Sequence, residues 1–194
     1  MRHNLSEIFE VIKDRRTIYP ELYSTRKVHK EIIEKLLNAA TWAPTHGKTQ
    51  PWRFTVFQSE ESRKELANFL VESYKHATPE EKRSEAKLLK MENRPMASTA
   101  VIGVCMERQE SERIPEIEEI MAVACAVQNM QLMATAYGIG AFWSTPKFLL
   151  GDAGKQFFNL AEKDRCLGLI YLGYPKDEWP KGQRKPIEYL STWK

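Results

Sequence analysis

The chain has 194 residues, of which 42% are hydrophobic and 28% charged, and its formal net charge is +3 at pH 7. These values are typical of one globular domain and exclude disordered and collagen-like chains. The charge is too small for the dense basic face of a nucleic-acid-binding protein, and no apolar run reaches the roughly 20 residues that cross a bilayer. The first residues form no apolar signal region, so we expect a cytoplasmic protein with no nucleic-acid or membrane partner.

Cysteine and histidine give no metal or disulfide signal. The three cysteines lack C-x-x-C spacing and each lies in an apolar segment, which predicts buried, reduced thiols at Cys105, Cys125 and Cys166. The four histidines are scattered, without the spacing of metal ligands. Gly138-x-Gly140 lacks the third glycine and the preceding strand of a dinucleotide fingerprint, and the motifs of phosphate-binding loops and hydrolases are missing.

Caps and apolar periodicity predict the first half of the chain. Asn4 followed by Glu7 is a helix-capping pattern, and Ser59 is a second N-cap. Between them, a proline and a glycine interrupt the helical pattern and predict a loop over 43–51. The predicted elements are helices over 6–14, 29–41 and 59–74 and a strand over 52–58.

The second half of the chain alternates buried strands with helices. Thr78-Pro79, followed by two acidic residues, is typical of a helix start, and the many charges that follow predict one solvated face. The segment 117–137 is apolar nearly all round, which indicates a core or interface helix. The other predicted elements are strands over 100–106, 141–143 and 166–171, a helix that begins at Thr145-Pro146, and a helix over 152–159. Strands separated by helices predict an α+β or α/β layered domain.

The last residues of the chain have little periodicity but carry Trp179, Tyr189 and Trp193. A tail of this length with aromatic anchors rarely floats free. We therefore expect the tail, over about 176–194, to wrap a second subunit.

Three polar clusters are candidates for a binding site, and each has a plain structural alternative. Arg15-Arg16-Thr17 can grip a phosphate or an anionic ring through forked hydrogen bonds, although on local grounds the pair more simply complements the carboxyl end of the first helix. The loop over 44–52 suits the polar edge of a planar ligand, or is only a helix-to-strand connection. The segment 140–146 ends a strand with two hydroxyls that can bind an anion or a heteroaromatic ring, or Thr145 only caps a helix.

Taken together, the clusters resemble the nitroreductase family of FMN-dependent oxidoreductases. The resemblance is closest to the small, YdjA-like members, in which a His-Gly pair stands in the Pro-to-Gln loop. It rests on five segments in the family order, which are Arg15-Arg16-Thr17, 43–52, 136–143, 172–175 and Arg184-Lys185-Pro186.

The resemblance implies a fold, a cofactor and a reaction. It implies an α+β fold with a mostly antiparallel central sheet flanked by helices, in a homodimer that exchanges its C-terminal tails and binds FMN at the interface. It implies that hydride passes from NADPH or NADH, by a ping-pong mechanism, to an electron-poor acceptor such as a nitroaromatic or a quinone. Because the flavin carries this chemistry, no catalytic acid–base pair is expected.

The resemblance also implies the cofactor-binding residues. Five of them would hold the phosphate, the ribityl chain and the pyrimidine edge: Arg15, Arg16, Thr17, Arg184 and Lys185. Three would approach the flavin, in part across the dimer interface: Thr45, His46 and Gln50. Three would line the isoalloxazine ring: Trp143, Ser144 and Thr145.

The sequence departs from the family pattern in two places. Thr17-Ile18-Tyr19 follows where the family usually has an Arg-Ser-x-Arg motif, so a basic contact of that motif is missing. His46-Gly47-Lys48 stands where many members carry Asn. In the family the segment 74–94 often belongs to a lid near the flavin, so its residues Tyr74, Lys75 or Arg94 could touch substrate.

Two other functions remain open at this point, since a fold does not fix a function. One is a flavin-binding carrier or regulator that reacts slowly with nicotinamides. The other is a different flavin-dependent oxidation on the same fold, such as flavin fragmentation, dehalogenation or desaturation.

Overall fold

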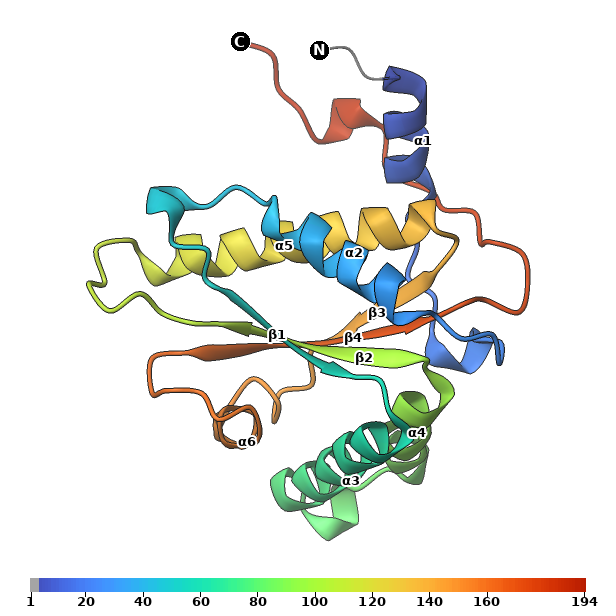
Figure 1. Cartoon of the computed structure of the whole chain (residues 1–194), viewed down its shortest axis with the longest axis vertical. Coiled ribbons are helices and arrows are strands. Elements are labelled where there is room, and N and C mark those ends of the chain that lie inside the picture. Colours follow the sequence, from blue (N-terminus) through green and yellow to red (C-terminus); the bar gives the residue numbers. More distant parts are fainter. Residues whose placement is uncertain (1–3) are drawn as a thin grey trace.

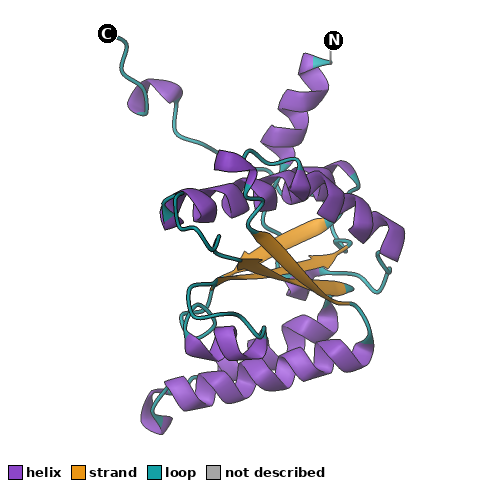
Figure 2. Cartoon of the chain, turned by 60° about the vertical axis from the view of Figure 1, so that its left-hand side comes forward, coloured by secondary structure: helices purple, strands orange, loops and turns teal. Residues whose placement is uncertain are grey.

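The computed structural model describes residues 4–194, in which a four-stranded sheet lies between two layers of helices (Figure 1, Figure 2). All three pairs of neighbouring strands are antiparallel. In spatial order the strands are β1 (Trp52–Phe57), β2 (Ala100–Met106), β4 (Arg165–Gly173) and β3 (Gly140–Ser144). This arrangement confirms the predicted α+β fold with an antiparallel central sheet.

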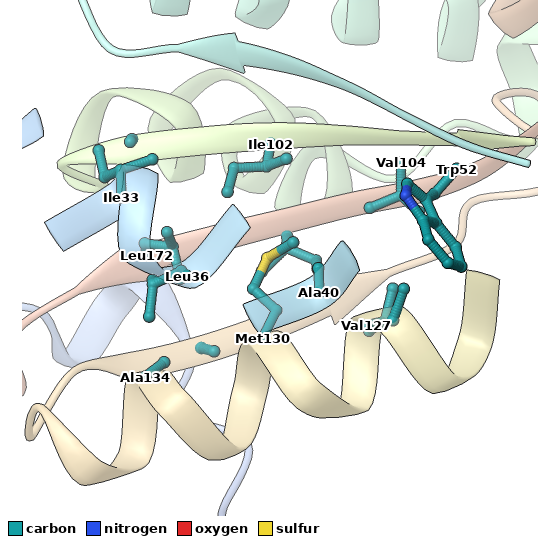
Figure 3. Close-up of a cluster of buried hydrophobic side chains, with 14 of the residues drawn as sticks. Ile33, Leu36, Ala40, Trp52, Ile102, Val104, Val127, Met130, Ala134 and Leu172 are labelled. Atoms are coloured by element: carbon teal, nitrogen blue, oxygen red, sulfur yellow. The ribbon is translucent and has the colours of Figure 1, made fainter. Parts of the chain in front are cut away.

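The first face of the sheet is covered by α2 (Lys30–Thr41) and α5 (Glu116–Ala136) (Figure 1). Apolar side chains from both helices interlock with those of the central strands to form the larger core (Figure 3). Leu36, Ile102 and Met130 are fully buried there. Helix α5 has a second row of apolar residues that faces away from this core, where Ile117 and Met121 are more than half exposed.

The opposite face is covered by α3 (Glu60–Ala77), α4 (Glu85–Ala97) and α6 (Asp152–Phe157) (Figure 2). This side encloses a second core that includes Leu66 and Leu70 of α3. Since helices cover the sheet on both faces, every residue of β2 is buried. None of the helices within residues 4–194 is long and apolar enough to span a membrane.

Helix α1 (Leu5–Asp14) stands apart from both layers, and the C-terminal tail leaves the molecule at the same end (Figure 1). The predicted cap at Asn4 is confirmed, because its side chain accepts hydrogen bonds from the amides of Ser6 and Glu7. No residue of α1 is buried, although Phe9 and Ile12 are among its apolar side chains. The apolar face of α1 is therefore left without a partner within the described part of the chain.

Two predicted helix starts are wrong. After Thr78-Pro79 the chain makes only a short 3-10 turn, Glu80–Lys82, and α4 begins later, with Ser84 as its N-cap. After Thr145-Pro146 the chain makes only turns before α6. In both places a cap and a proline favour helix locally, but the segment that follows is interrupted within one turn.

The thiol prediction is confirmed for two cysteines and wrong for the third. Cys105 and Cys166 lie opposite each other on the neighbouring strands β2 and β4, and both are buried free thiols. Cys125 is exposed on α5. An apolar helix does not show in its sequence which of its faces meets the sheet, so the exposure of Cys125 could not be foreseen.

Candidate functional site

A cluster of guanidinium groups lies where α1 ends. Helix α1 stops at Asp14 and the chain turns to an extended conformation at Arg15, which directs Arg15 and Arg16 away from the helix axis. Burial lowers the pKa of Arg15, and the positive charges of Arg184 and then Arg16 lower it further. The fold therefore brings Arg184, from the C-terminal tail, close to the arginine pair.

The tail reaches this cluster through two contacts. The Trp179 indole N–H donates to the Asp14 carbonyl at 2.5 Å, at the last residue of α1. Further along, the backbone at Gly182 is pressed against the Arg16 guanidinium, so that a Cβ on this glycine would lie 2.2 Å from the Arg16 Cζ. The tail backbone therefore lies directly against the Arg16 side chain and leads on to Arg184 two residues later.

The three arginines lack a counter-charge. None of the ion pairs within residues 4–194 involves Arg15, Arg16 or Arg184. In addition, the buried Nε of Arg16 has no hydrogen-bond partner in that part of the chain. A buried N–H donor without an acceptor is costly, and three unpaired guanidiniums favour a multiply charged anion. These residues therefore fit the phosphate group of FMN. Lys185, which follows Arg184 in the sequence, is exposed.

The segment after the arginine pair lies along the edge strand β3. Thr17 forms a parallel bridge with Ala141, and the Ile18 amide donates to the Ala141 carbonyl at 3.2 Å. This contact places the arginine pair beside the strand that ends in Trp143 and Ser144. Two of the three predicted clusters are thus brought together in one chain.

Within the β3 cluster the three predicted residues differ in what they can offer a ligand. The Trp143 indole N–H is already occupied, since it donates to the Leu167 carbonyl at 3.0 Å. Ser144 is half-buried, and Thr145 is exposed and caps no helix of the described chain. Trp143 can therefore act only as a wall, whereas the hydroxyls of Ser144 and Thr145 are available to a polar ring edge.

The third cluster, in the loop before β1, lies at the other end of α5. His46 Nδ1 is 2.6 Å from a carboxylate oxygen of Glu118 in the first turn of α5. The backbone amide of Gln50 donates to Thr45 Oγ1 at 3.3 Å. Arg16, in contrast, lines a cavity together with Thr135, near the last turn of α5.

The length of α5 separates the loop from the arginines. Glu118 and Thr135 are 17 residues apart on this helix, which at 1.5 Å per residue corresponds to about 25 Å. One chain therefore does not bring Thr45, His46 and Gln50 to the arginine cluster.

Residues in the segment 74–94 have different surroundings. Tyr74 is buried and its hydroxyl accepts a hydrogen bond from the Ser84 amide, and Lys75 pairs with Glu72 on the same helix. Arg94 lies beside the β3 cluster, with its guanidinium 5.5 Å from the ring centre of Tyr19. A cation is thus present beside Tyr19 after all, supplied by α4.

Two further features did not emerge from the sequence. An apolar groove of about 1,010 Å³ runs between α1, α2 and α5, with Ile8, Trp42 and Met133 among its lining residues. Lys87, Lys90 and Arg94 form a second feature, a row on α4 that faces the end of β3. Their spacing of three and four residues shows in the sequence that they share one face of a helix. The same spacing is found on ordinary solvated helix faces, so it does not indicate a binding site.

Comparisons with known proteins show which family the chain resembles. The profile of the nitroreductase family matches residues 12–174. YdjA of Escherichia coli (strain K12), named as a predicted NAD(P)H nitroreductase, is 30% identical over 146 residues, which cover 75% of this chain and 77% of YdjA. The crystal structure of a nitroreductase-like family protein from Bacillus cereus superposes with a TM-score of 0.83 at 29% identity and covers 100% of this chain and 98% of its own.

A structure with a bound cofactor shares the fold. A predicted nitroreductase from Exiguobacterium sibiricum, solved in complex with FMN, has a TM-score of 0.73 at 20% identity, with 100% of each chain covered. The family match, the identity to YdjA and the shared fold confirm the resemblance drawn from the sequence. The chain therefore belongs to the nitroreductase family of enzymes.

Proposed function

We propose that the protein binds FMN and passes hydride from NADPH or NADH, by a ping-pong mechanism, to an electron-poor acceptor such as a nitroaromatic or a quinone. The observation that supports this most directly is the gathering of Arg15, Arg16 and Arg184 without a carboxylate partner in residues 4–194. Forked, charge-assisted hydrogen bonds from such a cluster match a phosphate dianion. When bound, FMN would supply the ring that accepts and donates hydride.

In this proposal the side chains bind and orient, and none acts as an acid or a base. The guanidiniums neutralise the phosphate, with Lys185 next to Arg184 in sequence. Thr17, Ser144 and Thr145 offer hydroxyls along the edge of β3. The ring of Trp143, fixed by its bond to the Leu167 carbonyl, forms an apolar wall that keeps water from one side.

We further propose that two copies of the chain build each site. Thr45, His46 and Gln50 can contribute only from a second copy, because α5 holds them far from the arginines. The apolar groove between α1, α2 and α5 and the exposed face of α1 support a two-fold interface at this surface. In such a homodimer the loop of one copy can meet the arginines of the other.

The absorbance spectrum of the purified protein tests the proposal. We expect a yellow protein with a flavin spectrum that bleaches when NADPH or NADH is added without oxygen, and regains its colour with a nitroaromatic or a quinone. A colourless protein that takes up no added FMN would contradict the proposal. Flavin that is bound but reduced only slowly by both nicotinamides, as measured by stopped flow, would favour a flavin carrier or regulator instead.

A further inference from the structure

A small cavity with a cationic lining lies at the end of β3, on the face of the sheet covered by α3 and α4. Its volume is about 110 Å³, and its polar lining residues are Lys87, Lys90, Arg94, Ser144 and Tyr171. A wider hollow of about 390 Å³ shares Lys90 and Arg94 with it and is bounded by Tyr19, Glu21 and Leu22. Because Ser144 belongs to the proposed flavin site, this cavity adjoins it.

The cavity carries more positive charge than its surroundings balance. Arg94 Nε and Nη2 donate to one carboxylate oxygen of Glu21, at 3.0 and 2.9 Å. Within residues 4–194 neither Lys87 nor Lys90 forms an ion pair. The cavity therefore holds three cations and, among the described residues, only one nearby carboxylate, that of Glu21. Because this carboxylate pairs with Arg94, the two lysines are able to pair with an anion.

Arg94 is held rigidly in this arrangement. Its guanidinium lies 4.9 Å from the ring centre of Phe142 and 5.5 Å from that of Tyr19, in addition to the bonds with Glu21. Its side chain is 18% exposed. A cation fixed in this way needs little reordering when an anion arrives, which strengthens binding.

A buried hydroxyl adds a hydrogen-bond donor. Tyr171 is 3% exposed, and burial raises the pKa of its phenol, so the hydroxyl keeps its proton. The Tyr23 hydroxyl donates to the backbone carbonyl of Tyr171 and not to its hydroxyl. In the described part of the chain, the Tyr171 hydroxyl forms no side-chain hydrogen bond. With Ser144 beside it, the cavity presents hydroxyl donors and cations together, which suits a ligand made of acceptor atoms.

Aromatic rings connect the two hollows, because Tyr19 bounds the wider one, Tyr171 lines the small one and Phe142 packs against both rings. The Tyr19 and Phe142 ring centres are 4.9 Å apart, and those of Phe142 and Tyr171 are 5.7 Å apart. Tyr19 is 48% exposed, so part of its ring is open to the wider hollow. The small cavity has the volume of about three or four water molecules, which accommodates a carboxylate group but no dinucleotide.

We propose that the acceptor is an aromatic carboxylate, whose anionic group enters the small cavity and is selected by Lys87, Lys90 and Arg94 while its ring lies against Tyr19. This inference rests on the proposed function, because it assigns the substrate class of the same flavin site. The lysines would decide specificity through binding and take no part in the hydride transfer itself.

A matched pair of ligands tests the proposal. 4-Nitrobenzoate and 4-nitrobenzamide share the ring and the nitro group and differ in the charged group. We expect the flavin-loaded protein to bind the carboxylate about tenfold more tightly than the amide, by isothermal titration, as charge-assisted hydrogen bonds predict. The preference should decrease as salt is added.

Substitutions test which side chains cause the preference for the carboxylate ligand. In Lys87→Gln/Lys90→Gln, with Arg94 still in place, the preference for the carboxylate should fall from about tenfold to about twofold, and the KM for 4-nitrobenzoate should rise about fivefold with kcat nearly unchanged. Lys64→Gln/Lys82→Gln removes two exposed lysines away from the cavity and should keep the preference. Tyr171→Phe should weaken the carboxylate alone, by about threefold to tenfold.

Three outcomes would overturn the inference and leave the proposed function intact, provided the protein is yellow and bleached by NADPH. The first is equal affinity of the parent protein for both ligands. The second is an unchanged preference in Lys87→Gln/Lys90→Gln. The third is a raised KM for NADPH in that variant with 4-nitrobenzoate unaffected, which would assign the cations to the hydride donor. A protein that binds no flavin would instead contradict the proposed function.

Discussion

At the scale of single residues, the guanidinium cluster works against the stability of the chain that contains it. Burial lowers the pKa of Arg15, and repulsion by the positive charges of Arg184 and Arg16 lowers it further. Arg16 also keeps a buried Nε without a partner in residues 4–194. An anion removes both costs at once, so the cluster is better suited to the ligand-bound protein than to the free chain.

Removing one of these arginines should therefore separate cofactor affinity from stability. Arg184→Ala and Arg15→Ala should each weaken FMN binding by about 2 kcal/mol, or roughly 30-fold in Kd, through loss of a charged hydrogen bond. The flavin-free Arg184→Ala protein should melt no lower than the parent. A fluorescence titration of flavin-free protein measures the Kd, with exposed Arg113→Ala as the control. Unchanged affinity in both variants would contradict the phosphate site.

A buried ion pair behaves in the opposite way. Glu119 of α5 pairs with Arg108, and their side chains are 1% and 8% exposed. One carboxylate oxygen of Glu119 has no partner in the described chain, so Arg108 is the main compensation for a buried charge. The pair ties the loop after β2 to the start of α5.

Arg108→Ala should lower the free energy of unfolding by about 3 kcal/mol, because it leaves the Glu119 carboxylate buried and unpaired. Replacing both partners together, as Arg108→Met/Glu119→Met, should cost less than Arg108→Ala alone. Urea unfolding provides the measurement. The exposed pair of Lys30 and Glu34 serves as the control, since Lys30→Ala should cost less than about 0.5 kcal/mol. Equal costs for the two single variants would show that Glu119 is compensated in another way.

How far the sequence could predict the site is also a matter of single residues. Arg15-Arg16-Thr17 was recognisable as an anion-binding candidate, but on local grounds complementing the end of α1 was the simpler explanation. The deciding fact is the approach of Arg184, which depends on the path of the tail past Gly182. Such a long-range contact leaves no periodic signal in the sequence.

At the scale of elements, the segment that leaves the arginine pair is fixed by two glycines of the sheet. A Cβ at Gly140 would lie 2.8 Å from the Ile18 Cβ, and one at Gly173 would lie 2.4 Å from Cδ2 of the Tyr23 ring. The Tyr23 hydroxyl reaches the carbonyls of Ile18 and Tyr171, each at 2.9 Å. The sheet therefore accepts this segment only where it lacks side chains.

Gly173→Ala should displace Tyr23, and with it the segment that positions Arg15 and Arg16. We expect a loss of about 2 kcal/mol in stability from overpacking, together with weaker FMN binding. Gly151→Ala is the matched control, because its nearest neighbour would be an ordinary 3.8 Å away. Thermal unfolding and FMN titration measure the two effects. Normal affinity in a destabilised Gly173→Ala protein would show that the segment does not position the arginines.

Element boundaries show where sequence prediction fails and why. The helix expected from Thr78-Pro79 is replaced by a later start at Ser84, whose amide donates to the Tyr74 hydroxyl. Arg83 also donates to the carbonyls of Lys75 and Thr78, which draws the chain back over the end of α3. Two cap signals competed, and tertiary contacts decided between them. Asn4 and Ser59 had no competitor nearby, and their predicted caps are confirmed.

At the scale of the whole molecule, one side is built like an interface. Apolar side chains from α1, α2, α5 and the tail are exposed there, and the largest are more than three-fifths exposed: Leu5, Phe9, Trp42, Ile187, Tyr189, Leu190 and Trp193. A monomer rarely leaves so many of them in water. The tail beyond Arg184 is exposed along its length and extends away from its own chain, and we predict that it wraps a second subunit (Figure 1).

Deleting residues 187–194 keeps Arg184 and Lys185 but removes the exposed apolar part of the tail. We expect this truncated protein to run as a monomer or to aggregate in size-exclusion chromatography with light scattering, because the tail holds the partner. Deletion of residues 180–194 should also remove the colour, since Arg184 is lost. Trp193→Ser alone should only weaken association. A stable yellow dimer of the shorter truncation would rule out the clasp.

The contact of the Gly182 backbone with the Arg16 guanidinium has a consequence for the proposed binding of FMN. The same few residues of the tail contact the arginine cluster and lead into the exposed apolar segment 187–194, which we propose as the contact with a second copy. Occupancy of one should therefore favour occupancy of the other, as reciprocal linkage requires. We expect flavin to dissociate when the protein is diluted. Saturating flavin should keep the subunits associated at concentrations where they otherwise dissociate.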